Sequence, residues 1–134
     1  MPNLQKEKEI VRKYYSALDE ASKNNLTEVI SSYTNKNYIW RGFYPFEIQN
    51  NIESLLESVW YPLRHSFRSF QRRTDIFFAG QNFIDNGSTV WVCSMGHLMG
   101  LFDNPWLNIK PTKKIAMIRY AEFHKIENEK ISET

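Results

Sequence analysis

Residues 96–134 read GHLMGLFDNPWLNIKPTKKIAMIRYAEFHKIENEKISET. This stretch contains two strand-like runs of apolar and aromatic residues, separated by a loop rich in Trp, Pro and Asn. His97 lies on the first run and Glu122 on the second, so we expect each ionisable group in partly dry surroundings. A carboxylate and an imidazole in such a place suit proton transfer on a small organic molecule. An inert polar network in the core would use the same two residue types.

Alternation with a period of two extends upstream of this stretch and predicts a run of antiparallel strands. Two hairpins are expected: residues 71–84 and 88–102 flank the turn Asp85-Asn86-Gly87, and residues 113–126 and 130–134 flank Glu127-Asn128-Glu129.

The first third of the chain has helical periodicity instead. Apolar residues recur at three- and four-residue spacing from Ile10 to Ala21 and predict a first helix. Asn25 with Glu28, and Asn50 with Glu53, have the capping-box spacing that opens a second and a third helix. Residues 37–46 between them favour a strand followed by a turn, and Pro62 should end or kink the third helix.

Helices followed by strands indicate an α+β domain. We expect one domain over residues 1–134, with a curved antiparallel sheet and three N-terminal helices arranged as a cone around a pocket. The aromatic content of 15% favours a thick core or an aromatic-lined cavity.

Composition argues against several classes of partner. The formal net charge is only +2, so we expect no nucleic-acid partner. We interpret the cluster of Arg64, Arg68, Arg72 and Arg73 as part of a solvated surface. The N-terminal residues lack the apolar segment of a signal peptide, and no apolar run is long enough for a membrane helix. The single cysteine, Cys93, fits a reducing compartment and is expected to be buried and inert. These features predict a cytoplasmic protein without membrane partners.

Metal and cofactor motifs are absent from the sequence. The three histidines lack metal-ligand spacing, and neither a Gly-rich phosphate loop nor a nucleophile elbow occurs. We therefore expect no metal and no redox cofactor.

Five segments in order resemble the SnoaL-like polyketide cyclase and ester cyclase group of the nuclear transport factor two-like superfamily. They are WRGFYPFE (40–47), WYPLRHSF (60–67), GHLMGLF (96–102), PWLNIKPTKK (105–114) and RYAEFHKIENEKISET (119–134). The resemblance implies an α+β cone in which helices close a bent sheet over a ligand cavity, and a homodimer formed through the sheet.

The same resemblance assigns roles to two residues. Glu122 takes the position of the family's acidic general acid/base, a few residues before a hairpin, and His97 takes that of its histidine. Glu122 stands where an aspartate is usual, and Asn108 and Lys113 stand where glycines are usual. Family members usually continue past the position of Thr134, so we expect a truncated last strand or an incomplete lid.

Strand alternation groups the candidate residues around Glu122. Tyr120, Glu122 and His124 should share one face of their strand. If that face lines the cavity, desolvation should raise the pKa of Glu122 toward neutrality, and Tyr120 or His97 would stabilise an enolate oxygen. The alternative is a static pairing of Glu122 with a neighbouring cation.

Two tryptophans and one arginine complete the candidate ligand-binding set. Trp40 and Trp106 lie near chain breaks and are expected to line or cap a pocket, with ordinary packing as the alternative, whereas Trp60 is expected in the core. Arg64 is a candidate for binding a ligand carboxylate, with surface placement as its alternative.

Three functional hypotheses follow. The first is a cofactor-independent acid/base enzyme of cyclase or isomerase type, acting on an apolar oxygenated substrate. The second is a non-catalytic ligand-binding or dimeric assembly module of the same fold, and the third is a hydrolase in which Glu122 activates water. A fold alone cannot separate them.

Overall fold

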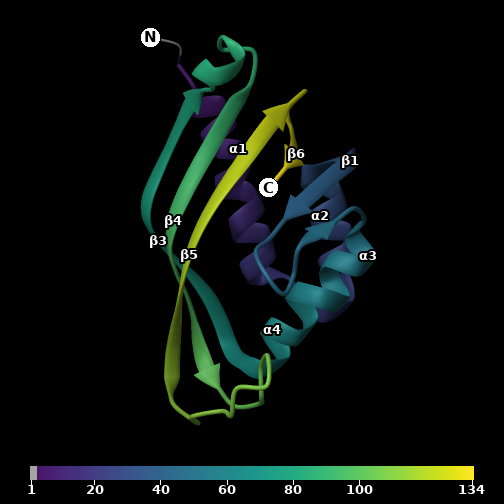
Figure 1. Cartoon of the computed structure of the whole chain (residues 1–134), viewed down its shortest axis with the longest axis vertical. Helices are drawn as coiled ribbons and strands as arrows, with labels where there is room; N and C mark the ends of the chain where they lie inside the picture. Colours follow the sequence, from purple (N-terminus) through teal and green to yellow (C-terminus); the bar gives the residue numbers. More distant parts are fainter. Residues whose placement is uncertain (1–2) are drawn as a thin grey trace.

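A computed structural model describes residues 3–134, and Figure 1 shows its course. The helical segments are α1 (Gln5–Glu20), α2 (Leu26–Tyr33), α3 (Ile52–Leu55) and α4 (Tyr61–Ser66), with short 3₁₀ turns at Lys23–Asn25 and Phe83–Asp85. The strands are β1 (Thr34–Arg41), β2 (Ile48–Gln49), β3 (Phe67–Gln81), β4 (Val90–Phe102), β5 (Ile115–Glu127) and β6 (Lys130–Glu133).

The strands form one six-stranded sheet in the order β2-β1-β6-β5-β4-β3. All neighbours are antiparallel except β1 and β6, which run parallel. The long strands β3, β4 and β5 bend along their length, and the helices lie on one side of the sheet (Figure 1). The predicted α+β class and curved sheet are confirmed, as are both predicted hairpin turns.

The third helical segment continues past Pro62. A π-helical turn, Leu56–Trp60, joins α3 to α4, and Pro62 lies at the start of α4. Proline removes one backbone N–H donor from this continuous helical run, and the π-helical turn just before Pro62 is where the regular hydrogen-bond pattern changes. Of the two expected effects of Pro62, ending the helix is wrong, because the helix extends to Ser66; the regular α-helical pattern is instead interrupted by the π-helical turn just before the proline.

The predicted helix caps are only partly correct. The Asn25 side chain makes no cap bond to α2 and instead accepts a hydrogen bond from Ser22 Oγ at 3.1 Å. The cap of α3 is Asn51 rather than Asn50, and its Oδ1 accepts from the Ser54 backbone N–H at 2.8 Å. The spacing to Glu53 favours Asn50, but the cap bond is made by Asn51 to the residue three positions further on, which is Ser54.

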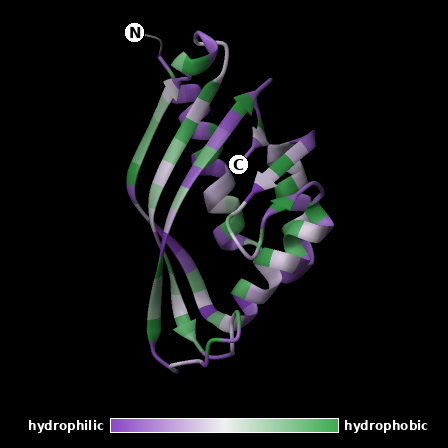
Figure 2. Cartoon of the chain, in the orientation of Figure 1, coloured by the Kyte–Doolittle hydropathy of each residue, from purple (hydrophilic) through white to green (hydrophobic). Residues whose placement is uncertain are grey.

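The two faces of the β3–β5 sheet differ in what covers them. The inner face packs against the helices and carries the core residues of these strands, Phe67, Val92, Leu98, Phe102, Tyr120 and Ile126. Hydrophobic and hydrophilic residues are interspersed along the strands (Figure 2). The outer face carries large apolar side chains that stay half exposed, namely Ile76, Phe78, Ile115, Met117 and Phe123.

Within residues 3–134, none of the helices combines the length and the apolar character that crossing a bilayer requires.

Candidate functional site

A central cavity of about 430 Å³ lies where β5, β1, the α3–α4 segment and the loop after β4 meet. We call it the central cavity. Its wall is mainly aromatic and aliphatic, and Glu122 contributes a carboxylate from the inner face of β5. The lining residues that matter below are Trp40, Phe46, Trp60, Trp106, Tyr120 and Glu122.

Glu122 is held by a buried ion pair with Arg72 of β3. Arg72 Nη1 donates to Glu122 Oε1 at 2.6 Å, and only 5% of the arginine side chain and 19% of the glutamate side chain are exposed. The guanidinium lies 3.8 Å from the ring centroid of Tyr15 and 4.4 Å from that of Tyr120. The cation is therefore fixed between two aromatic rings as well as by the carboxylate.

The other carboxylate oxygen faces His124, which is fully buried on the same side of β5. His124 Nε2 lies 3.2 Å from Glu122 Oε2 and 2.7 Å from the hydroxyl of Tyr15, with which it shares a hydrogen bond. His124 Nδ1 lies 2.9 Å from the Thr134 hydroxyl, which in turn accepts from Tyr38. Both ring nitrogens of His124 thus have protein partners.

Tyr120 is equally committed to protein partners. Its hydroxyl lies 2.8 Å from Ser94 Oγ and 3.2 Å from Thr74 Oγ1. Its ring lines the central cavity, but its hydroxyl already has two hydrogen-bond neighbours.

This network lowers the pKa of Glu122 to about 2. Burial alone would raise the pKa, but the charge of Arg72 and the hydrogen bond with His124 outweigh it. Burial would likewise lower the pKa of Arg72, yet Glu122 and Tyr15 raise it above its ordinary value. The expectation of a Glu122 pKa near neutrality is wrong, and the alternative of a pairing with a neighbouring cation is confirmed.

The structure does not bring His97 to Glu122. The strand register places Glu122 opposite Ser94 and His97 opposite Arg119, so their side chains leave opposite faces of the sheet. His97 Nδ1 lies 3.2 Å from Asp75 Oδ2 on the outer face. The predicted cooperation of His97 with Glu122 therefore has no geometric basis.

Only some of the remaining residues predicted to bind a ligand lie in the wall of the central cavity. Tyr120, Trp40 and Trp106 line the central cavity, and their binding role stays a prediction. His124 is in contact with Glu122 but is not among the residues that line the cavity. Arg64 donates to the backbone carbonyls of Leu18 and Ala21 at the end of α1, so its guanidinium closes a helix end rather than facing the cavity.

Arg72 is the site residue that the sequence pattern places wrongly. Its position in a cluster of arginines predicts a solvated surface, yet it lies opposite Leu98 on the inner face. Strand alternation places Arg72 on the same face as Phe70 and Thr74. That pattern could have predicted an inward position for Arg72, because Phe70 is partly covered and the Thr74 hydroxyl contacts Tyr120. Tyr15 lies within the predicted first helix, between Ile10 and Ala21, and is the second network member that the pattern does not assign to the site.

Among residues 3–134, no three His, Cys, Asp or Glu side chains gather as the ligands of a metal ion would.

Comparison of the whole fold with solved structures identifies several neighbours. A candidate SnoaL-like polyketide cyclase from Jannaschia sp. CCS1 superposes with a TM-score of 0.71 and 14% identity, over 96% of this chain and 82% of that chain. AclR, a candidate hydroxylase from Streptomyces galilaeus, gives a TM-score of 0.72 at 10% identity, over 98% and 77%. An NTF2-like protein from Burkholderia thailandensis E264 gives 0.63 at 16%, over 94% and 85%.

The fold is that of the NTF2-like proteins, including structures named as SnoaL-like polyketide cyclases. At the sequence level no family model and no curated protein matches the chain. The solved structures with this fold are named as different kinds of protein, so the fold alone does not identify an activity.

Proposed function

We propose that this protein binds a small, largely apolar, oxygenated molecule in the central cavity. The observation that carries the proposal is a cavity of about 430 Å³ whose mainly aromatic and aliphatic wall contains the ionised carboxylate of Glu122. Small-molecule sites commonly have volumes of about 300–1,000 Å³ and a few placed polar groups among apolar ones.

Glu122 supplies the polar recognition in this proposal. Its low pKa keeps the side chain a carboxylate above about pH 2, so it can only accept hydrogen bonds. Arg72 holds one oxygen in place, and stacking on Tyr15 and Tyr120 holds Arg72. A ligand hydroxyl that donates to Glu122 would meet an acceptor whose position is set beforehand.

Acid/base catalysis at the same residue is the second candidate, favoured by the position of Glu122 in the wall of a ligand-sized cavity and by its contact with His124, which does not itself line the cavity. Glu122 would take a proton from a carbon next to a ligand carbonyl, and the C–H electron pair would become the enolate. A carboxylate with a pKa of about 2 is a weak base for that step and for activating water. Binding requires no change of this pKa, so it is the primary proposal, ahead of an isomerase, cyclase or hydrolase activity.

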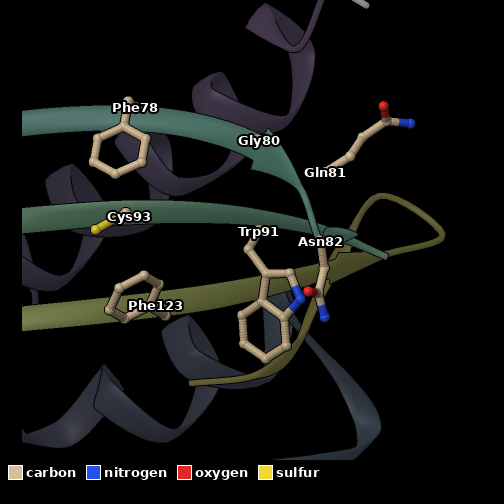
Figure 3. Close-up of a pocket in the computed structure, with 7 residues that line it drawn as sticks. All are labelled: Phe78, Gly80, Gln81, Asn82, Trp91, Cys93 and Phe123. Carbon is tan, nitrogen blue, oxygen red and sulfur yellow. The ribbon is translucent and has the colours of Figure 1, made fainter. Parts of the chain in front are cut away.

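We also propose that two copies of the chain associate through the outer face. Phe78, Cys93 and Phe123 lie in one row across β3, β4 and β5, along a groove of about 490 Å³ that also includes Trp91 (Figure 3). Phe78 is 52% exposed and Phe123 55%. A contiguous apolar patch of this kind marks an interaction site, and a second copy related by twofold symmetry would cover it with the same residues.

Thermal unfolding in the presence of small polycyclic ketones, quinones and lactones tests the binding proposal. A ligand that binds only the folded state stabilises it by about 2.7 kcal/mol at a hundredfold excess over Kd, so at least one compound should raise the Tm of the wild type. Val59→Trp should abolish the rise because Val59 lines the cavity, whereas Val59→Ala should keep it.

Two outcomes contradict the proposal: no compound raises the Tm, or Val59→Trp responds like the wild type. A compound that binds both wild type and Glu122→Gln, but is converted only by the wild type, would instead establish the catalytic candidate.

A further inference from the structure

The central cavity reaches the open edge of β5. Its wall includes six consecutive residues of that strand, 118–123. Successive side chains of a strand point to opposite faces, so a cavity lined by all six reaches the edge of the strand and is not confined to one face. The edge is open because β6 pairs with β5 only over residues 125–127. Over residues 115–124, β5 has β4 on one side and, within the described residues 3–134, no strand on the other.

The central cavity and the groove of the outer face, which we call the outer groove, meet at this edge. Trp91 and Phe123 line both of them. The register places both residues on the outer face, since Phe123 lies opposite Cys93, two residues from Trp91 on β4 (Figure 3). Phe123 is 55% exposed, and Phe43, which also lines the cavity, is 78% exposed. In a single copy of the chain the cavity therefore opens to solvent beside the outer face.

Two arginines also line the central cavity. Arg41 donates from Nε to Glu133, so its charge already has a partner. Arg119 lies opposite His97, which puts its exposed side chain on the outer face and not inside the cavity. Neither guanidinium is therefore a fixed, unpaired donor for a ligand within the cavity.

A second copy bound to the outer face would cover this opening. The proposed interface is the row of Phe78, Cys93 and Phe123, so a copy that covers the row also covers Phe123 and with it part of the cavity wall. Small-molecule sites commonly bury about 70–90% of the surface of a drug-sized ligand. When the partner closes the opening, the cavity buries more of its ligand, and a larger buried apolar area gives tighter binding.

We propose that the second copy completes the central cavity, so that the dimer binds the ligand more tightly than the monomer does. This inference rests on the proposed binding function of the cavity and on the proposed dimer. The coupling is reciprocal: the factor by which dimer formation tightens a site is the factor by which a ligand at that site tightens the dimer. A dimer has two such sites, so the factor applies twice to its dissociation constant.

Phe78→Lys separates the interface from the cavity. Phe78 lines the outer groove but not the central cavity, so a lysine there should disrupt the dimer without altering the cavity wall. In titration calorimetry with 9-fluorenone as the probe, Phe78→Lys should bind about tenfold more weakly than the dimeric wild type. Phe83→Lys, at the exposed β3–β4 turn, should stay dimeric and bind like the wild type.

A second measurement needs no interface variant and covers the case in which Phe78→Lys does not fold. In sedimentation equilibrium of the wild type, saturation with 9-fluorenone should lower the dimer dissociation constant about hundredfold, which is about tenfold for each of the two sites. Val59→Trp fills the cavity, so its dimer should not respond to the probe.

Failure of the coupling can be told apart from failure of the two proposals beneath it. Equal affinity of Phe78→Lys monomers and wild-type dimers for 9-fluorenone would overturn the coupling and leave cavity binding and the dimer intact. A dimer that the probe weakens would also overturn it, because the ligand would then occupy the outer groove. A monomeric wild type, or a dimeric Phe78→Lys, would refute the outer-face dimer and the inference with it. A wild type that does not bind 9-fluorenone at about 1 mM would refute cavity binding of this ligand class, and again the inference.

Discussion

Arg72 and Glu122 form the pair on which the polar side of the site depends. Taking two charges out of water is costly, and a buried pair often stabilises a protein no more than an apolar pair of the same volume would. Removing one partner of a buried pair destabilises a protein, because the other charge is then buried without an opposite charge beside it. We interpret the pair as a device that fixes the Glu122 carboxylate in the cavity wall and keeps it ionised.

The low pKa of Glu122 predicts an acid-sensitive contribution to stability. In the unfolded chain a glutamate titrates near pH 4.3, so unfolding takes up a proton between that pH and about pH 2. The contribution, about 3 kcal/mol, should be present above about pH 5 and should disappear as the pH falls toward 2. Urea unfolding of wild type and Glu122→Gln over this range measures it.

The wild type should lose more stability on acidification than Glu122→Gln, which has no titrating group at this position. Glu127→Gln, an exposed glutamate on the same strand, controls for the removal of a charge. Parallel curves for wild type and Glu122→Gln would mean that Arg72 does not hold the carboxylate ionised.

At the level of elements, the pairing of β3 with β4 depends on a glycine. The register shifts between Thr74 and Ile76, and Gly96 lies opposite Thr74 at this irregularity. A Cβ at Gly96 would come within 2.0 Å of the Arg73 carbonyl oxygen, which no backbone can accommodate without moving. Gly96 therefore lets β3 approach β4 closely just where β3 presents Arg72 to the site.

Gly96→Ala should destabilise the fold by about 2–4 kcal/mol, because β3 must move away from β4. Gly80→Ala is the matched control: it lies on the same strand pair, nothing lies within 4 Å of its added Cβ, and its effect should be about 0.5 kcal/mol or less. Chemical denaturation measures both. Equal stability of the two variants would show that the bulge tolerates a side chain.

At the scale of the whole molecule, the bent sheet has two surfaces of different use, which meet at Trp91 and Phe123, because these two residues line both the central cavity and the outer groove. The helices and the loop after β4 cover its inner face and leave the central cavity, whereas large apolar side chains remain half exposed on its outer face. The same strands thus present a cavity to one side and an apolar surface to the other.

The proposed dimer should dissociate when a charge is placed in that interface. Phe123→Lys should yield monomers in sedimentation equilibrium at concentrations where the wild type is dimeric, because burying an unpaired ammonium is unfavourable. Phe83→Lys is the control, since Phe83 is 86% exposed at the β3–β4 turn, away from the row of Phe78 and Phe123. A monomeric wild type, or a dimeric Phe123→Lys, would contradict the outer face as interface.

Periodic patterns in the sequence predict the elements of this fold better than local motifs do. Helical spacing from Ile10 to Ala21 and strand alternation in β5 predict their elements correctly, because both patterns record which side of an element is buried. Cap positions and the course of the chain through Pro62 are less predictable. They depend on single hydrogen bonds and on a π-helical turn, and neither produces a periodic pattern in the sequence.

The sequence by itself determined the class of the fold, the helix and strand order, and the common face of Tyr120, Glu122 and His124. Only the tertiary structure decided that His97 faces away from Glu122, that Arg64 closes a helix end, and that Arg72 is the partner of Glu122. The physical reason is distance along the chain. Periodicity describes one element at a time, whereas the pKa of a carboxylate depends on which charge another strand, fifty residues earlier, brings within hydrogen-bond reach.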